Sequence, residues 1–171
     1  MTEEKFIHTN LKNELTRDFL MEILTQYHYE KKDMEMLEEV AGGLRECLTG
    51  EEGFYCVTRN RCEQIINLPR VENYAVGIFT LGSRVDELQN RYSSTERLRE
   101  AYAVETICWE LLRKGYEMFQ RWAEAHLKQR LESYHFFGAD EELSFEKMAQ
   151  ILSGVGQKRI NCNQAFCMEP K

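Results

Sequence analysis

The chain has 171 residues, of which 29 are acidic and 22 are basic, so its formal net charge is −7. This acidic balance argues against a protein that binds nucleic acid by neutralising phosphates, because such proteins need a basic surface. Apolar residues make up 43% of the chain, which is typical of a folded core and excludes a disordered tail. The length fits one ordinary domain.

The first 50 residues are predicted to form two helices. Apolar residues recur at helical spacing from about residue 11 to 27, and again from about 34 to 48. Thr49 and Gly50 then end the pattern. We expect residues 1–50 to be an N-terminal helical segment of the same domain as residues 51–171.

Two strands and one long helix are predicted next. Residues 54–58 are aromatic and β-branched, as strands are, and residues 74–81 are apolar on both faces, as in a strand inside a sheet. From 95 to about 127, apolar residues recur every three or four positions, which predicts a helix with one buried side. Gly115 in its middle costs about 1 kcal/mol relative to alanine, so we expect another element or a ligand to lie close to it.

The last part of the chain is predicted to contain a short helix and an extended stretch. Ser144 is placed to cap a helix that runs to about residue 152, and residues 154–156 then turn the chain. Residues 159–168 read as extended. The order of elements predicts a single α+β domain, with N-terminal helices and a mostly antiparallel sheet packed against the long helix.

No catalytic or metal site is visible in the residue pattern. The six cysteines include no CxxC pair, so we expect free thiols and no structural metal. Glu105 and Glu110 are five residues apart on the long helix and project about 140° from each other. They cannot form one carboxylate pair. Either both are solvated or salt-bridged acids, or one of them faces a pocket.

Nothing in the sequence resembles a membrane or export segment. The longest apolar runs fall far short of the roughly 20 residues that span a bilayer, and the polar first residues are not followed by an apolar stretch. We therefore expect no signal peptide, no membrane partner and a cytoplasmic location.

Two parts of the sequence resemble a known family. One runs from Phe79 to Tyr92 (FTLGSRVDELQNRY) and continues from Leu98 to Leu112 (LREAYAVETICWELL), and the other runs from Lys158 to Lys171 (KRINCNQAFCMEPK). Together they resemble the activation domain of cobalamin-dependent methionine synthase in its short, stand-alone bacterial form. That family has a strand ending in Thr-Leu-Gly, a helix with Asp-Glu-Leu, a long helix carrying acids and a late Glu-Ser-x-Met-Met-x-Pro segment.

The resemblance implies an accessory role in methionine biosynthesis. In that family, the domain presents S-adenosylmethionine to cobalamin (vitamin B12) that has been oxidised to cob(II)alamin. A flavodoxin-like donor supplies the electron, and methyl transfer restores methylcobalamin. The task is positioning rather than acid–base chemistry. The chain would be at most an accessory part of a methyltransferase, and it would reach cobalamin only through a partner protein.

The resemblance also implies a set of cofactor-binding residues. Glu110 matches an acidic position on the family's long helix, near the cobalamin, and Glu105 matches a common acidic neighbour. Asn163 and Gln164 fall on the late segment that lines the S-adenosylmethionine cleft. Arg130, with Tyr134, is placed to replace the arginine that grips the methionine carboxylate.

Three departures from the family pattern favour an alternative. The interval from 130 to 140 lacks the Arg-x-x-Pro-Gly-Tyr run, Gln164 and Ala165 stand where the family usually has Glu-Ser, and the sequence ends just after the late proline. These departures imply a cofactor site that is incomplete, degenerate or completed by another chain. The alternative is a non-catalytic binding module that docks on a corrinoid protein through its acidic N-terminal helices. An unrelated enzyme is the third possibility.

Overall fold

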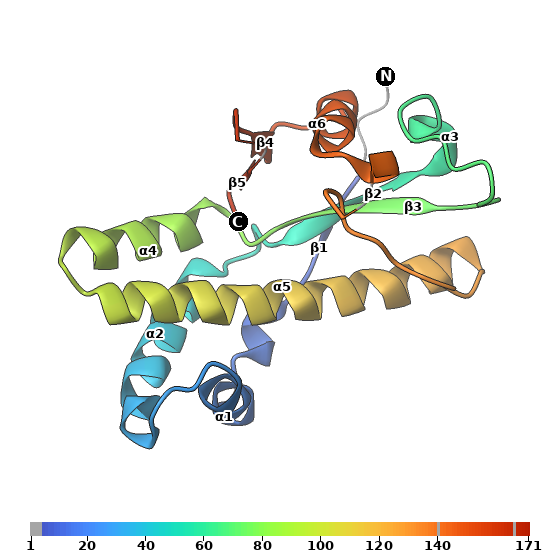
Figure 1. The fold of residues 1–171 in the computed structure, drawn as a ribbon. Coiled ribbons are helices and arrows are strands. Elements are labelled where there is room, and N and C mark those ends of the chain that lie inside the picture. The colour runs from blue at the N-terminus through green and yellow to red at the C-terminus, as the bar shows by residue number, and fades with distance from the viewer. Residues whose placement is uncertain (1–4, 140, 166) are drawn as a thin grey trace. The chain divides into compact units, whose positions relative to one another are not determined.

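The computed structural model describes residues 5–139, 141–165 and 167–171, and it confirms the predicted α+β class (Figure 1). The α-helices are α1 (Arg17–Gln26), α2 (Met34–Cys47), α3 (Arg59–Cys62), α4 (Ser83–Ser94), α5 (Leu98–Leu127) and α6 (Phe145–Gly154). The strands are β1 (Phe6–His8), β2 (Gly53–Thr58), β3 (Ala75–Thr80), β4 (Asn161–Cys162) and β5 (Met168–Glu169). Short 3-10 helices lie at Leu11–Glu14, Lys31–Asp33 and Glu141–Leu143.

The chain forms two compact units that alternate along the sequence. The sheet unit comprises the described residues of 1–7, 54–78 and 117–169, and the helical unit comprises 8–53, 79–116 and 170–171. Strands β1, β2 and β3 form an antiparallel sheet in that order, and β4 pairs separately with β5. The predicted division into residues 1–50 and 51–171 of one domain stays a prediction.

The helical unit contains the two predicted N-terminal helices. The first begins at Arg17 rather than near residue 11, because the side chain of Thr16 accepts a hydrogen bond from the backbone N–H of Phe19 (3.3 Å) and caps the helix there. Residues 11–14 form a 3-10 turn instead. Helix α1 packs on α2, and α2 packs on α4. The apolar residues that predicted these helices are buried between them: Phe19, Leu20, Ile23, Leu24, Leu37, Val40 and Leu44.

The first half of α5 supplies the other side of this core. Its buried residues include Ala101, Val104, Cys108 and Leu111, the side predicted from their spacing. Gly115 lies against β3, since a Cβ atom added to it would sit 3.4 Å from Cδ1 of Phe79. The predicted close approach at Gly115 is therefore confirmed, and the neighbour is a strand.

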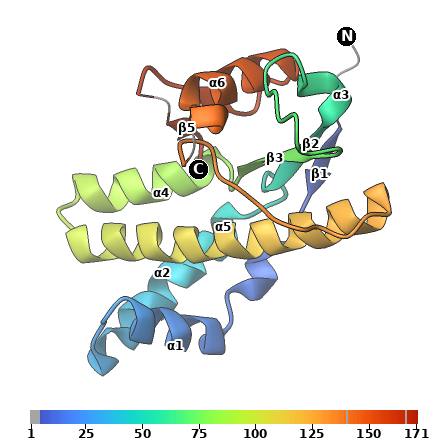
Figure 2. The same cartoon turned by 45° about the vertical axis from the view of Figure 1, so that its right-hand side comes forward.

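In the sheet unit, the sheet lies between the C-terminal part of α5 and α6 (Figures 1 and 2). Phe54 of β2 packs edge-on against Phe119 and Trp122 of α5, at centroid distances of 5.3 and 5.6 Å. The next residue, Tyr55, belongs to the opposite core together with Ile151 of α6. Successive side chains of a strand point to opposite faces, so the sheet is covered on both sides. The expectation that residues 74–81 form a strand inside the sheet is wrong, because β3 is at the edge of the order β1-β2-β3 and β2 is the central strand.

Two short elements of the sheet unit were not predicted from the sequence. Strand β1 has three residues and α3 has four, and elements this short show no measurable period. Both are held by contacts distant in sequence. Phe6 of β1 packs edge-on against Tyr55 of β2, with ring centroids 4.9 Å apart, and Cys62 of α3 belongs to the core shared with α6.

Within the part of the chain that the structure describes, no helix has both the length and the apolar content that crossing a membrane would require.

The packing at Gly115 can be tested with two substitutions. Gly115→Ala should be neutral or should raise the free energy of unfolding by up to about 1 kcal/mol, because alanine favours the helix and its methyl group meets only ordinary contacts. Gly115→Leu should lower it by about 1–3 kcal/mol, because a larger side chain overpacks against Phe79. Urea unfolding of both variants measures this, and equal stability of the two would contradict the close packing.

Candidate functional site

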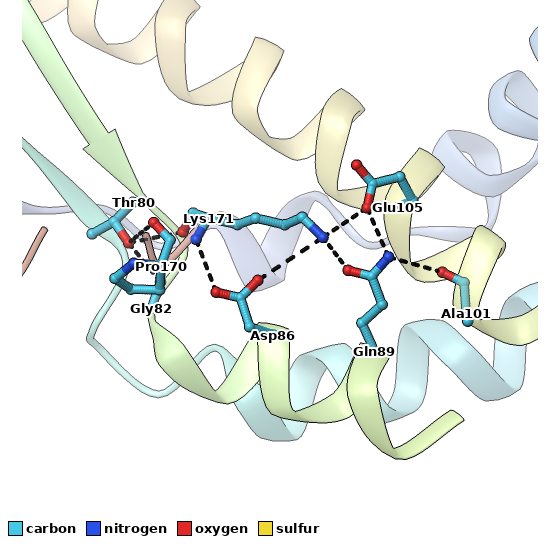
Figure 3. Close-up of polar contacts among 8 residues, drawn as sticks. All are labelled: Thr80, Gly82, Asp86, Gln89, Ala101, Glu105, Pro170 and Lys171. Carbon is cyan, nitrogen blue, oxygen red and sulfur yellow. Dashed lines mark hydrogen bonds and ion pairs between the residues drawn. The ribbon is translucent and has the colours of Figure 1, made fainter. Parts of the chain in front are cut away.

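The main polar cluster of the helical unit surrounds Glu105 on α5 (Figure 3). The ammonium group of Lys171 lies 2.6 Å from Oε2 of Glu105. Gln89 of α4 donates to the same oxygen through Nε2 (2.7 Å), and its own Oε1 accepts a hydrogen bond from Lys171. Three segments far apart in the sequence therefore meet at one carboxylate.

The backbone of Lys171 is held as firmly as its side chain. Its N–H donates to Oδ2 of Asp86 in the first turn of α4 (3.1 Å), and its carbonyl oxygen accepts from the hydroxyl of Thr80 (2.8 Å) and from the N–H of Leu81. Thr80 also accepts from the N–H of Gly82. The Thr80–Gly82 turn, which carries part of the family resemblance, has a structural role here.

The charge state of Glu105 follows from these contacts. Burial opposes its ionisation, but hydrogen bonds from Lys171 and Gln89 outweigh that effect, so the pKa of Glu105 lies below its ordinary value of 4.5. Glu105 is an anion at neutral pH and is already neutralised by a cation of its own chain.

Glu110 lies in a second, separate cluster of the same unit. Its carboxylate is almost fully buried and accepts hydrogen bonds from Arg113 (2.8 Å), from Gln26 (3.0 Å) and from the hydroxyl of Tyr27 (3.1 Å). Burial, followed by the bond to Glu110, raises the pKa of Tyr27. The prediction that Glu105 and Glu110 cannot form one pair is confirmed, and both are salt-bridged acids.

Helix α5 also exposes three large apolar side chains. Leu98, Tyr102 and Trp109 are 67, 54 and 57% exposed. Spacings of four and seven residues place them on one side of the helix. We call these three residues the α5 aromatic face. The spacing of these three residues is visible in the sequence, whereas nothing there indicates that Lys171 would lie beside Glu105.

The other four predicted cofactor residues belong to the sheet unit. Arg130 and Tyr134 are exposed in the segment that follows α5, where the ring of Tyr134 contacts that of Phe136 (centroids 5.8 Å apart). Asn163 and Gln164 are exposed in the turn between β4 and β5. Within the described residues, no hydrogen bond or ion pair joins the first two to the last two.

Asn163 is occupied by the turn in which it lies. Its Oδ1 accepts from the N–H groups of Ala165 (2.9 Å) and Cys167 (3.0 Å), and its Nδ2 donates to Glu169 (2.9 Å). These bonds close the β4–β5 turn, as asparagine side chains commonly do. Its polar atoms serve the local fold.

Two small hollows lie in the sheet unit and measure about 20 and 40 Å³. Sites for small ligands usually measure about 300–1,000 Å³. Neither hollow approaches the size of S-adenosylmethionine.

The cysteines are free thiols, as predicted, with Cys47, Cys62 and Cys108 buried and Cys167 exposed. Burial raises the pKa of the Cys108 thiol to about 12, so it is not a thiolate at neutral pH. No group of three or more histidine, cysteine or acidic side chains lies close enough to hold a metal ion within residues 5–139, 141–165 and 167–171.

Comparison of the chain with protein-family models, with curated proteins and with solved structures gives no match. The family resemblance therefore depends on the sequence stretches quoted above.

The ion pair at Glu105 predicts a pH-dependent stability. The pKa of Glu105 is lower in the folded state than in the unfolded state, where it is about 4.3, so ionised Glu105 stabilises the fold at pH values above 4.3. That contribution is lost as the pH falls through the folded-state pKa. Lys171→Met should therefore be less stable than the wild type at pH 7, with a difference that shrinks below about pH 4. Unfolding curves from pH 7 to pH 3 test this.

Lys171→Arg keeps the cation and serves as the matched control, which should restore most of the stability. A carboxyl NMR titration should also show the pKa of Glu105 rising in Lys171→Met. An unchanged pKa would contradict the ion pair.

Proposed function

We propose that this protein is a non-catalytic binding module of the methionine synthase activation-domain type, which docks on a corrinoid protein. The observation that carries the proposal is the α5 aromatic face, an exposed apolar surface on the same helix as two internally neutralised acids. The identity of the partner comes from the family resemblance.

The composition of the α5 aromatic face suits protein recognition. Aromatic side chains are enriched at interfaces, and buried tryptophan and tyrosine supply much of the binding energy there. On the same helix, Glu105 pairs with Lys171 and Glu110 pairs with Arg113, so neither acid leaves an unpaired negative charge beside the apolar side chains.

The same residues give little support to S-adenosylmethionine binding. Glu105 is paired with Lys171, Asn163 closes its own turn, and Arg130 is exposed in a segment without the Pro-Gly-Tyr run. The two hollows of the sheet unit are far too small for the cofactor.

One observation favours a second candidate, in which the protein presents S-adenosylmethionine during reductive reactivation. The carboxylate of Glu105 is partly exposed and already binds a cation, the ammonium of Lys171. The sulfonium of S-adenosylmethionine could replace that ammonium. A flavodoxin-like donor would then supply the electron. In both candidates the chain works in the cytoplasm, and cobalamin is bound by the partner.

Calorimetry separates the two candidates. Titration of the purified protein with S-adenosylmethionine, with S-adenosylhomocysteine for comparison, should give no saturable heat up to millimolar ligand. The variant Lys171→Met, which frees Glu105, should behave in the same way. Micromolar binding by either protein would favour the second candidate.

Docking predicts a specific effect of one tryptophan. Trp109→Ala should weaken binding to cobalamin-dependent methionine synthase in its cob(II)alamin state by about tenfold or more, without added S-adenosylmethionine, because a central aromatic contact is lost. The matched control is Tyr134→Ala, which removes a similarly exposed ring from the sheet unit and should leave affinity unchanged. Biolayer interferometry measures both, and equal affinities would contradict docking through α5.

A further inference from the structure

The ammonium of Lys171 lies in a site formed by side chains of α4 and α5, within the helical unit (Figure 3). Its Nζ is 2.6 Å from Oε2 of Glu105 and 3.9 Å from Oδ1 of Asp86, and it donates a hydrogen bond to Oε1 of Gln89. One oxygen from each of three side chains therefore faces the ammonium. An ammonium group carries three N–H donors and no acceptor, so this arrangement of oxygens suits a primary amine.

The orientation of Gln89 does not depend on Lys171. Its Nε2 donates to Oε2 of Glu105 (2.7 Å) and to the carbonyl oxygen of Ala101 (3.5 Å), both on α5. Because the amide nitrogen is bonded to α5, the amide oxygen is directed toward the ammonium. The same bond holds Oε2 of Glu105 in place. Two of the three oxygens are thus oriented by the helices themselves, so the site keeps its shape without the side chain of Lys171.

The site is open to solvent, and its occupant is anchored elsewhere. The side chains of Lys171, Asp86 and Glu105 are 27, 33 and 34% exposed, so a small amine can reach the oxygens. The backbone of Lys171 is held separately, by Asp86 at its N–H and by Thr80 and Leu81 at its carbonyl oxygen. The side chain can therefore be removed or replaced while the backbone stays bound.

We propose that Asp86, Gln89 and Glu105 form a binding site for primary alkylammonium groups, with Lys171 as its internal ligand. Acids alone would not identify a ligand, but the bound lysine does: the ligand is a primary amine at the end of an unbranched alkyl chain. External amines of this kind compete with Lys171 for the site. A sulfonium has no N–H and would leave the oxygens without a hydrogen bond, which costs free energy.

Chemical rescue tests the proposal. Lys171→Gly removes the side chain, and n-butylammonium supplies an amine on an alkyl chain of the same length. At constant ionic strength, this probe should raise the Tm of Lys171→Gly saturably, because it binds the folded state. The wild type should need at least about tenfold more of the probe, because its own lysine is tethered at the site. In a carboxyl NMR titration of Lys171→Gly, the probe should return the pKa of Glu105 toward the wild-type value.

Matched controls locate the site. Trimethylsulfonium has the same charge but no N–H, so it should give at least about tenfold weaker rescue. Adding Glu105→Gln to Lys171→Gly should also weaken the rescue at least about tenfold. Glu100→Gln is the same change on the same helix, at a carboxylate that pairs with Arg97 (2.9 Å), and should leave the rescue intact. Lys171→Ala with n-propylammonium repeats the experiment with a second variant.

Two further probes separate the sources of such an amine. Free L-lysine carries a carboxylate that Asp86 would repel, whereas Nα-acetyl-L-lysine methylamide has the backbone groups of a lysine residue within a chain. Tighter binding of the blocked lysine to Lys171→Gly would assign the site to lysine residues of polypeptides. Equal or tighter binding of free lysine would assign it to small amines.

Three results would overturn the proposal. They are the absence of rescue in both Lys171→Gly and Lys171→Ala, equal rescue by trimethylsulfonium, and full rescue in the variant that also carries Glu105→Gln. The inference goes beyond the proposed function, because it requires neither a corrinoid partner nor the α5 aromatic face. Failure here would therefore leave the proposed function standing.

Discussion

Burial of one side of α5 is the constraint on which the rest of the structure depends. The helix runs without interruption from Leu98 to Leu127 and supplies core residues to both units. In the helical unit its buried side contacts the N-terminal helices and, at Gly115, strand β3. In the sheet unit, Phe119 and Trp122 pack against Phe54 of β2. Within each unit, the buried residues of α5 recur at helical spacing, so each core requires its part of α5 to be helical.

The position of α5 also explains what its acids do. Glu105 and Glu110 project in different directions from the helix, and each is held by partners that come from the fold itself. An almost fully buried carboxylate such as Glu110 needs several hydrogen bonds to offset its desolvation. Gln26 and Tyr27 at the end of α1 supply two of them. The acids therefore join segments of the chain, whereas Leu98, Tyr102 and Trp109 of the same helix remain exposed.

Periodic elements could be predicted from the sequence because their information is local. The long helix, strands β2 and β3, the capping of α6 by Ser144 and the close approach at Gly115 all follow from composition and spacing. Strand β1 could not be predicted, because three residues show no period and its pairing with β2 spans more than forty residues of sequence. The contact of Lys171 with Glu105, 66 residues away, could not be predicted for the same reason.

The candidate site was predictable only in part, for a related reason. The sequence placed Glu105 and Glu110 on different sides of one helix, which is a local statement, and the structure agrees. Whether Arg130, Tyr134, Asn163 and Gln164 converge is a statement about tertiary contacts, which no spacing encodes. Asn163 illustrates the difference: its identity fits a ligand-binding amide, but its neighbours Ala165 and Cys167 use that amide to close a turn.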